Sequence, residues 1–104
     1  MNIQATLAKC RAELKRQKEM EAKATPGPWH PERFRTKSET KATLADMRYK
    51  NGGYDNDLLC LARNLNPARL AVADRMLAGI DDSNPSAEWF VDVAAHLLGV
   101  EVVE

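Results

Sequence analysis

Three consecutive residues, Pro26, Gly27 and Pro28, interrupt the chain and constrain every fold that it can adopt. Each proline fixes its own φ angle, lacks a backbone N–H and disfavours helical geometry in the residue before it. Thr25 and Gly27 are therefore biased away from the helical region. No helix continues through this segment, so the residues before it must form an element of their own.

The residues before this break have the pattern of one long amphipathic helix over residues 3–24. Their apolar side chains recur with the alternating spacing of four and three that places them on one helix face. These side chains are Ile3, Leu7, Cys10 and Leu14. The face is narrow, and it can pack against its own domain or against a second copy of the chain. We predict a homodimer through these four residues, because pairing two copies buries the face.

Residues 29–54 lack helical periodicity, and we expect a small β-hairpin there. Residues 29–37 and 43–49 alternate roughly between apolar and polar side chains, and a polar turn over residues 36–41 joins them. Pro31 cannot donate a backbone hydrogen bond, which restricts the first run to a sheet edge.

Trp29 follows the break immediately. A Trp beside a rigid hinge is most simply a core residue that fixes the first helix to the rest of the domain. An exposed Trp would instead be a hot spot for binding a partner. We expect Trp29 to be buried against the leucine-rich segment over residues 58–65, which we expect to be central to the core.

The second half of the chain has the patterns of three short helices. A leucine-rich helix begins near residue 55, after a turn rich in glycine. Asn66-Pro67 and Asn84-Pro85 each combine a good N-cap residue with proline at the first helical position, which predicts the starts of two further helices. Gly99 marks the end of the last one, and residues 100–103 have the pattern of a short strand.

These elements predict an α+β fold that is mainly α: a leading helix, a small β-hairpin and three short helices packed as one domain. The single domain covers residues 1–104, with the leading helix at 1–25, the Pro-Gly hinge and hairpin at 26–54, and a helical core at 55–104. The chain has only two Trp, two Tyr and two Phe residues. Its core must therefore consist mainly of aliphatic side chains, which favours helices.

Cys10 and Cys60 each lie in an apolar helical pattern, without the paired spacing of a disulfide framework or a zinc site. They indicate reduced, buried thiols in a cytoplasmic protein. We expect no signal peptide and no membrane association, because no window approaches the roughly 20 apolar residues of a membrane span.

No residue pattern points to catalysis, and we expect neither an enzyme nor a cofactor. His30 and His96 have no second ligand at metal spacing, so we expect no metal site. The adjacent residues Asp81 and Asp82 are typical of a turn rather than of a catalytic carboxylate pair.

The charges sum to zero but are unevenly distributed. Residues 1–50 contain twelve Lys and Arg against six acidic residues, whereas residues 51–104 contain three against nine, so the halves carry +6 and −6. Such an asymmetry indicates either a charged binding surface or neutralisation between neighbouring elements of the same chain.

The acidic second half predicts a surface for a protein partner, because from residue 81 onward there is no Lys or Arg. Uncompensated carboxylates attract a basic surface and steer its approach. The predicted partner-binding residues are Asp81, Asp82, Glu88 and Asp92.

The basic first half predicts the alternative, nucleic-acid binding. Aromatic residues interleave with cations in the hairpin, and such a mixture contacts phosphates and stacks on bases. The cations of this alternative site are Arg33, Arg35, Lys37 and Lys41. The zero net charge and the lack of a basic recognition helix favour a protein partner over nucleic acid.

Two stretches of the chain resemble a known family. They are residues 21–29 (Glu-Ala-Lys-Ala-Thr-Pro-Gly-Pro-Trp) and residues 56–77 with their Asn-Pro dipeptide. Both resemble the Ead-like accessory proteins of tailed phages and prophages, and the chain departs from that family after Gly79. The resemblance implies a phage protein in the cytoplasm of a bacterial host, with a host-directed role such as takeover or inhibition of a defence. It brings no catalytic residues.

Overall fold

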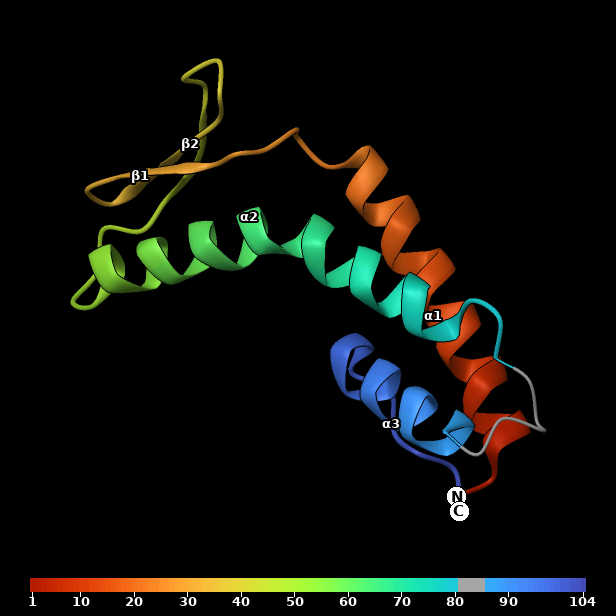
Figure 1. The fold of residues 1–104 in the computed structure, drawn as a ribbon. Coiled ribbons are helices and arrows are strands. Elements are labelled where there is room, and N and C mark those ends of the chain that lie inside the picture. Colours follow the sequence, from red (N-terminus) through yellow and green to blue (C-terminus); the bar gives the residue numbers. More distant parts are fainter. Residues whose placement is uncertain (81–85) are drawn as a thin grey trace. The chain divides into compact units, whose positions relative to one another are not determined.

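The computed structural model describes residues 1–80 and 86–104. Asp81 and Asp82, two of the predicted partner-binding residues, lie outside the described residues, as does the Asn84-Pro85 dipeptide. The elements in chain order are α1 (Ile3–Lys23), β1 (His30–Glu32), β2 (Arg35–Lys37), β3 (Thr43–Asp46), α2 (Gly52–Leu77) and α3 (Ala87–Leu98) (Figure 1). The fold is mainly α with a small antiparallel sheet, so the predicted class is confirmed.

Internal contacts divide the chain into two units. The helical unit comprises Met1–Glu21 and Pro67–Glu104, and the sheet unit comprises Ala22–Asn66. The division falls at Pro67, which lies inside α2. The expectation of one domain over residues 1–104 stays a prediction.

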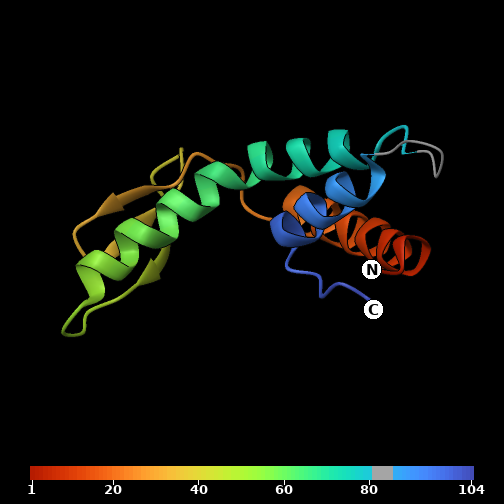
Figure 2. The ribbon, with the colours of Figure 1, turned by 60° about the horizontal axis from the view of Figure 1, so that its bottom comes forward.

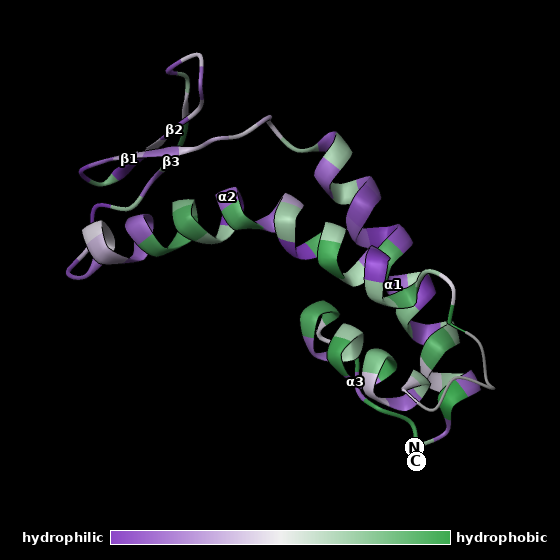
Figure 3. Cartoon of the chain, in the orientation of Figure 1, coloured by the Kyte–Doolittle hydropathy of each residue, from purple (hydrophilic) through white to green (hydrophobic). Residues whose placement is uncertain are grey.

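The helical unit has an aliphatic core formed by α1, the second half of α2 and α3. Small side chains are buried at its centre, which lets the three helices approach closely. The buried members are Leu7, Cys10, Leu14, Leu70, Ala73, Leu77, Val91, Ala94, Ala95 and Leu98. Figure 3 shows hydrophobic residues along α3, and hydrophobic and hydrophilic ones interleaved along α1.

This core overturns the basis of the predicted dimer contacts. Leu7, Cys10 and Leu14 are buried inside the helical unit, and Ile3 packs at its edge. The narrow face of α1 is covered because residues of α2 and α3 converge on it. A homodimer through these four residues would first require the core to open.

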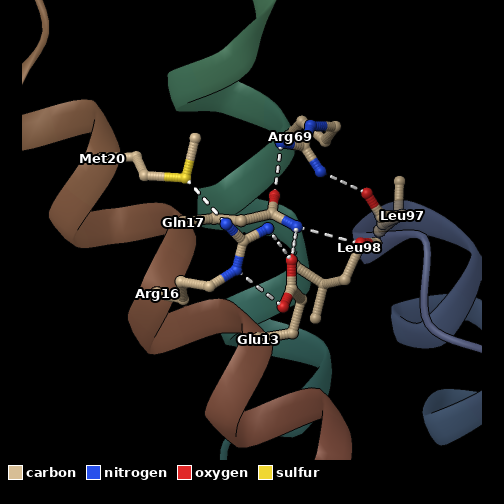
Figure 4. Close-up of polar contacts among 7 residues, drawn as sticks. All are labelled: Glu13, Arg16, Gln17, Met20, Arg69, Leu97 and Leu98. Atoms are coloured by element: carbon tan, nitrogen blue, oxygen red, sulfur yellow. Dashed lines mark hydrogen bonds and ion pairs between the residues drawn. The ribbon is translucent and has the colours of Figure 1, made fainter.

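A polar network closes the C-terminal end of α3 (Figure 4). Gln17 of α1 donates to the carbonyl of Leu98 at 2.9 Å, and the Arg69 guanidinium of α2 donates to the carbonyl of Leu97 and to the Gln17 amide oxygen. The last carbonyls of a helix lack partners within it, so these side chains satisfy them. Gly99 ends the helix with a φ of +71°, as predicted.

The same network includes an exposed ion pair on α1. Arg16 and Gln17 donate hydrogen bonds to the Glu13 carboxylate. These bonds favour its charged form and lower the pKa of Glu13 to about 2. The pair fixes the rotamer of Glu13 beside the side chain that caps α3.

The C-terminal segment joins the start of α1 and forms no strand, so the expected strand at 100–103 is wrong. The backbone N–H of Asn2 donates to the carbonyl of Val103 at 2.7 Å, and the N–H of Val103 donates to the Thr6 hydroxyl at 3.0 Å. Thr6 is fully buried. The Thr6 hydroxyl therefore accepts the backbone hydrogen bond that a neighbouring strand would otherwise accept. These contacts hold the two termini together (Figure 1).

The sheet unit contains three antiparallel strands in the order β1-β2-β3, beside the first half of α2 (Figure 2). The run over residues 29–37 was expected to be one strand, but it folds back on itself as β1 and β2 around a turn at Arg33 and Phe34. Thr43–Asp46 then pairs with β2 as the third strand. Pro31 lies in the edge strand β1, as predicted.

The region over residues 52–77 is one helix, so the predicted helix start at Asn66-Pro67 is wrong. A proline inside a helix removes one hydrogen bond and costs about 3 kcal/mol. Burial of Leu70, Ala73 and Leu77 on the far side of Pro67 offsets that cost. The described residues therefore contain three helices where four were expected.

Candidate functional site

One buried side chain attaches the sheet to α2. Asn56 is fully buried, and its amide nitrogen donates to the carbonyls of Arg33 at 3.2 Å and Arg35 at 2.8 Å. Its amide oxygen accepts a hydrogen bond from the Thr36 hydroxyl at 2.5 Å. Asn56 thus holds the backbone on both sides of Phe34. Its place in the sequence, near the expected start of the leucine-rich helix, does not indicate this role.

The turn that Asn56 holds has an unusual backbone. Glu32 pairs with Arg35, so only Arg33 and Phe34 connect β1 to β2. Arg33 has a φ of +58°, in the left-handed region that favours glycine. Holding a side chain there costs on the order of 1 kcal/mol. The N–H of Met47 donates to the carbonyl of Phe34 at 2.7 Å and fixes the other half of the turn.

An open groove of about 620 Å³ lies beside this turn. Three arginines, one phenylalanine and one acid line it. The lining residues are Glu32, Arg33, Phe34, Arg35 and Arg48. A second hollow of about 300 Å³ shares Arg33 and Phe34 with the groove and adds Lys50, Gly53, Tyr54 and Asp57.

Asp46 partly neutralises the groove. Its carboxylate lies 3.7 Å from the Arg35 guanidinium and 3.1 Å from that of Arg48. All three side chains are at least 40% exposed. Ion pairs so open to solvent contribute about 0 to 1 kcal/mol, so a competing anion can displace them.

The structure separates the four cations of the predicted nucleic-acid site. Arg33 and Arg35 line the groove, whereas Lys37 and Lys41 lie at the other end of β2, where the chain turns toward β3. The Lys37 ammonium donates to the Thr43 hydroxyl at 2.5 Å. Successive turns of antiparallel strands lie at opposite ends of a sheet, which explains the split. Arg48 joins Arg33 and Arg35 instead.

An apolar stripe follows the solvent side of α2 in the sheet unit. It comprises Tyr54, Leu58, Leu61 and Leu65, which are 81%, 66%, 56% and 56% exposed. Their spacing of four, three and four keeps them on one helix face. We call these four residues the α2 stripe. The sheet packs on a different face of the helix, through Asn56 and Cys60.

The α2 stripe overturns the expectation that the leucine-rich segment is central to the core. The apolar residues of the segment follow two faces, and the pattern alone does not say which one the sheet covers. In the structure that face has a glycine and an asparagine where the helix meets the rest of the unit. A Cβ atom on Gly52 would lie 1.6 Å from the carbonyl oxygen of Met47, so only glycine fits there.

Trp29 is half-buried, so the prediction of full burial is wrong. Its backbone N–H donates to the Asn64 side chain at 2.7 Å, and Asn64 donates back to the Trp29 carbonyl at 2.9 Å. The indole N–H donates to the Thr25 carbonyl, and the Arg63 guanidinium lies 5.2 Å from the ring centroid. Trp29 therefore fixes the Pro-Gly-Pro segment to α2 by polar and cation–π contacts.

The described part of the predicted acidic surface lies on α3. Glu88 is exposed and Asp92 is partly exposed. Trp89, which the sequence analysis did not single out, is 58% exposed beside them and stacks edge-on against Phe90 at 5.3 Å. The sequence contains a signal for this exposure. The buried face of α3 recurs at Ala87, Val91 and Ala94, and position 89 does not fall on that face.

The two cysteines are buried free thiols, as predicted. Burial raises the pKa of Cys10, and burial together with the charge of Asp57 raises that of Cys60. Within residues 1–80 and 86–104 no group of three or more His, Cys, Asp or Glu residues is placed to hold a metal ion. No helix in that part of the chain has both the length and the apolar character needed to cross a membrane.

No protein-family model matches this sequence, and searches of curated proteins and of solved structures find no significant match.

Proposed function

We propose that the chain is a small protein-binding protein, a phage or prophage accessory protein that acts in the cytoplasm of a bacterial host by binding a host protein. The observation that carries this proposal is the α2 stripe. Contiguous apolar side chains this exposed are uncommon on a monomer and typical of a surface that a partner covers. Each leucine that a partner buries contributes on the order of 1 kcal/mol.

The charges beside the stripe indicate the chemistry of the partner. Asp55 and Asp57 are exposed on the first turns of α2, and no Lys or Arg occurs between Gly52 and Arg63. A complementary surface therefore combines an apolar groove with a basic rim. Rim charges of opposite sign accelerate association and suppress wrong partners.

The surface on α3 supports the same class of function. Glu88 and Asp92 place carboxylates beside the exposed ring of Trp89. Trp is the residue type most enriched among the hot spots of interfaces. Trp89 would thus act as an apolar anchor beside the acidic residues, a feature that was not expected from the sequence.

Two further observations support a phage protein in the bacterial cytoplasm. The segment over residues 21–29 resembles the phage accessory family, and both cysteines are free and buried. An accessory protein that inhibits a host component by covering its surface needs an exposed anchor and no catalytic group.

The test is capture from nuclease-treated bacterial lysate by the tagged full chain and by two variants. Leu61→Asp places a charge in the α2 stripe, and Ala71→Asp places the same charge on an exposed position of α2 outside it. The proposal predicts that the chain and Ala71→Asp retain a protein that Leu61→Asp loses by at least tenfold.

Two outcomes contradict the proposal. Equal retention by all three proteins would mean that the stripe makes no contact with the captured protein. A dimer of the chain in sedimentation equilibrium that Leu61→Asp converts to a monomer would assign the stripe to a second copy.

A further inference from the structure

We propose that the groove beside the β1–β2 turn binds single-stranded nucleic acid, with Arg33, Arg35 and Arg48 on the phosphates and Phe34 against a base. The proposal is independent of the protein partner, because the groove and the α2 stripe are made of different residues. It retains two cations of the alternative site predicted from sequence and leaves out Lys37 and Lys41.

The first argument is the gathering of three arginines at one groove. They come from the turn, from β2 and from the segment after β3, and Glu32 is the one acid that lines the groove with them. The planar guanidinium matches the oxygens of a phosphate with two parallel hydrogen bonds. Asp46 already bridges Arg35 and Arg48 at the surface, in the way that a phosphate would.

The second argument is the aromatic ring among these cations. Phe34 is 43% exposed and lines both hollows. An exposed ring beside arginines is a stacking platform for an unpaired base, and each stacked base contributes about 1 to 3 kcal/mol. A site for phosphate alone, or for a phosphopeptide, has no need of an exposed ring.

The third argument is the backbone of Arg33. Glycine would occupy its left-handed conformation without strain, yet the chain has an arginine there. The structure stabilises this conformation through the hydrogen bonds from Asn56 to the carbonyls of Arg33 and Arg35. Strain that the surrounding structure holds in place points to a role for the side chain.

The fourth argument selects a single strand over a duplex. Most proteins that read the major groove of a duplex insert a helix with a basic exposed face, and a smaller group inserts a two-stranded β-ribbon, which the competition with duplex DNA described below tests. In the part of α2 that belongs to the sheet unit, the one Lys or Arg is Arg63, whose guanidinium contacts Thr25 and the Trp29 ring. The open groove between the turn and Arg48 fits bases that are splayed out one at a time.

The experiment measures fluorescence anisotropy of a labelled mixed-sequence DNA 12-mer, titrated with the full chain at low salt. Arg33→Gly relieves the strained backbone and removes one phosphate contact. It should weaken binding about tenfold, a loss within the range of one such contact, and leave the melting temperature unchanged or raised. Arg75→Gln removes the same charge from α2 in the helical unit and should leave the affinity within about twofold.

Two further variants separate stacking from charge. Phe34→Leu should weaken binding of the 12-mer at least fivefold without changing its dependence on salt. Asp46→Asn should tighten binding, because the carboxylate no longer competes with phosphate for Arg35 and Arg48.

The proposal is overturned by any of four results. These are no binding of the 12-mer, equal losses in Arg33→Gly and Arg75→Gln, unchanged affinity in Phe34→Leu, and displacement of the 12-mer by inorganic polyphosphate or by duplex DNA as readily as by unlabelled single strand. If the protein partner of the α2 stripe is never found, these measurements keep their meaning, since none of them uses it.

Discussion

At the scale of single residues, Asn56 determines where the arginine-lined groove lies. Its amide donates to two backbone carbonyls of the turn region and accepts from the Thr36 hydroxyl, and the Asn56 and Thr36 side chains are both fully buried. A buried polar group that loses its partner costs about 1 to 3 kcal/mol. The position of Arg33 therefore depends on a side chain that lies twenty-three residues away in the sequence.

Replacing Asn56 with alanine should lower the free energy of unfolding by about 2 to 3 kcal/mol, because the carbonyls of Arg33 and Arg35 lose their donor. Chemical denaturation measures the change. Lys15→Ala, at an exposed position of α1, is the control and should change stability by less than about 0.5 kcal/mol. Equal changes in the two variants would show that the buried amide does not hold the turn.

Sequence reasoning recovered part of the groove at this scale. Arg33 and Arg35 were selected because cations and aromatic residues interleave there, and the structure places both in one groove. The turn between them was missed because Arg33 and Phe34 lack the Asn or Gly that normally marks a two-residue turn. Without that turn, Lys37 and Lys41 could not be separated from the other two.

At the scale of elements, the ends of helices were easier to predict than their continuity. α1 ends at Lys23, shortly before the Pro-Gly-Pro break, and α3 ends at Leu98, with Gly99 as its C-cap. Both ends follow from local geometry, because proline and left-handed glycine act on their neighbours. The continuity of α2 through Pro67 depends instead on core packing of residues up to ten positions further on.

Replacing Pro67 with alanine should therefore stabilise the protein. The variant restores one N–H to the helix and removes the ring, and the gain should be about 1 to 3 kcal/mol. Pro67 is exposed, so little packing is lost. A rise in melting temperature tests this expectation. A fall would mean that the helix needs the proline.

Apolar composition also failed to distinguish the core from a binding surface. The leucine-rich segment of α2 was expected to be central to the core, but the α2 stripe is exposed. An apolar helix face is buried either by its own chain or by a partner, and periodicity is the same in both cases. The opposite error was made for the apolar face of α1. It was expected to bind a second copy, but the core of the helical unit covers it.

At the scale of the whole molecule, the opposed charges of the two halves are partly used within the chain. Lys18 of α1 lies 3.2 Å from Asp74 of α2, so a cation of the first half neutralises an acid of the second. Both are about half exposed, and the pair contributes little to stability. The carboxylates on α3 and at the start of α2 remain accessible to a partner.

The central claim is that the α2 stripe contacts a host protein. The most direct measurement is photo-crosslinking in bacterial lysate from a benzophenone amino acid placed at position 61, with position 71 as the control. We expect a crosslink to a protein other than the chain itself at position 61 and none at position 71. Crosslinks only between two copies of the chain, equal crosslinks at both positions, or no crosslink at position 61 would contradict it.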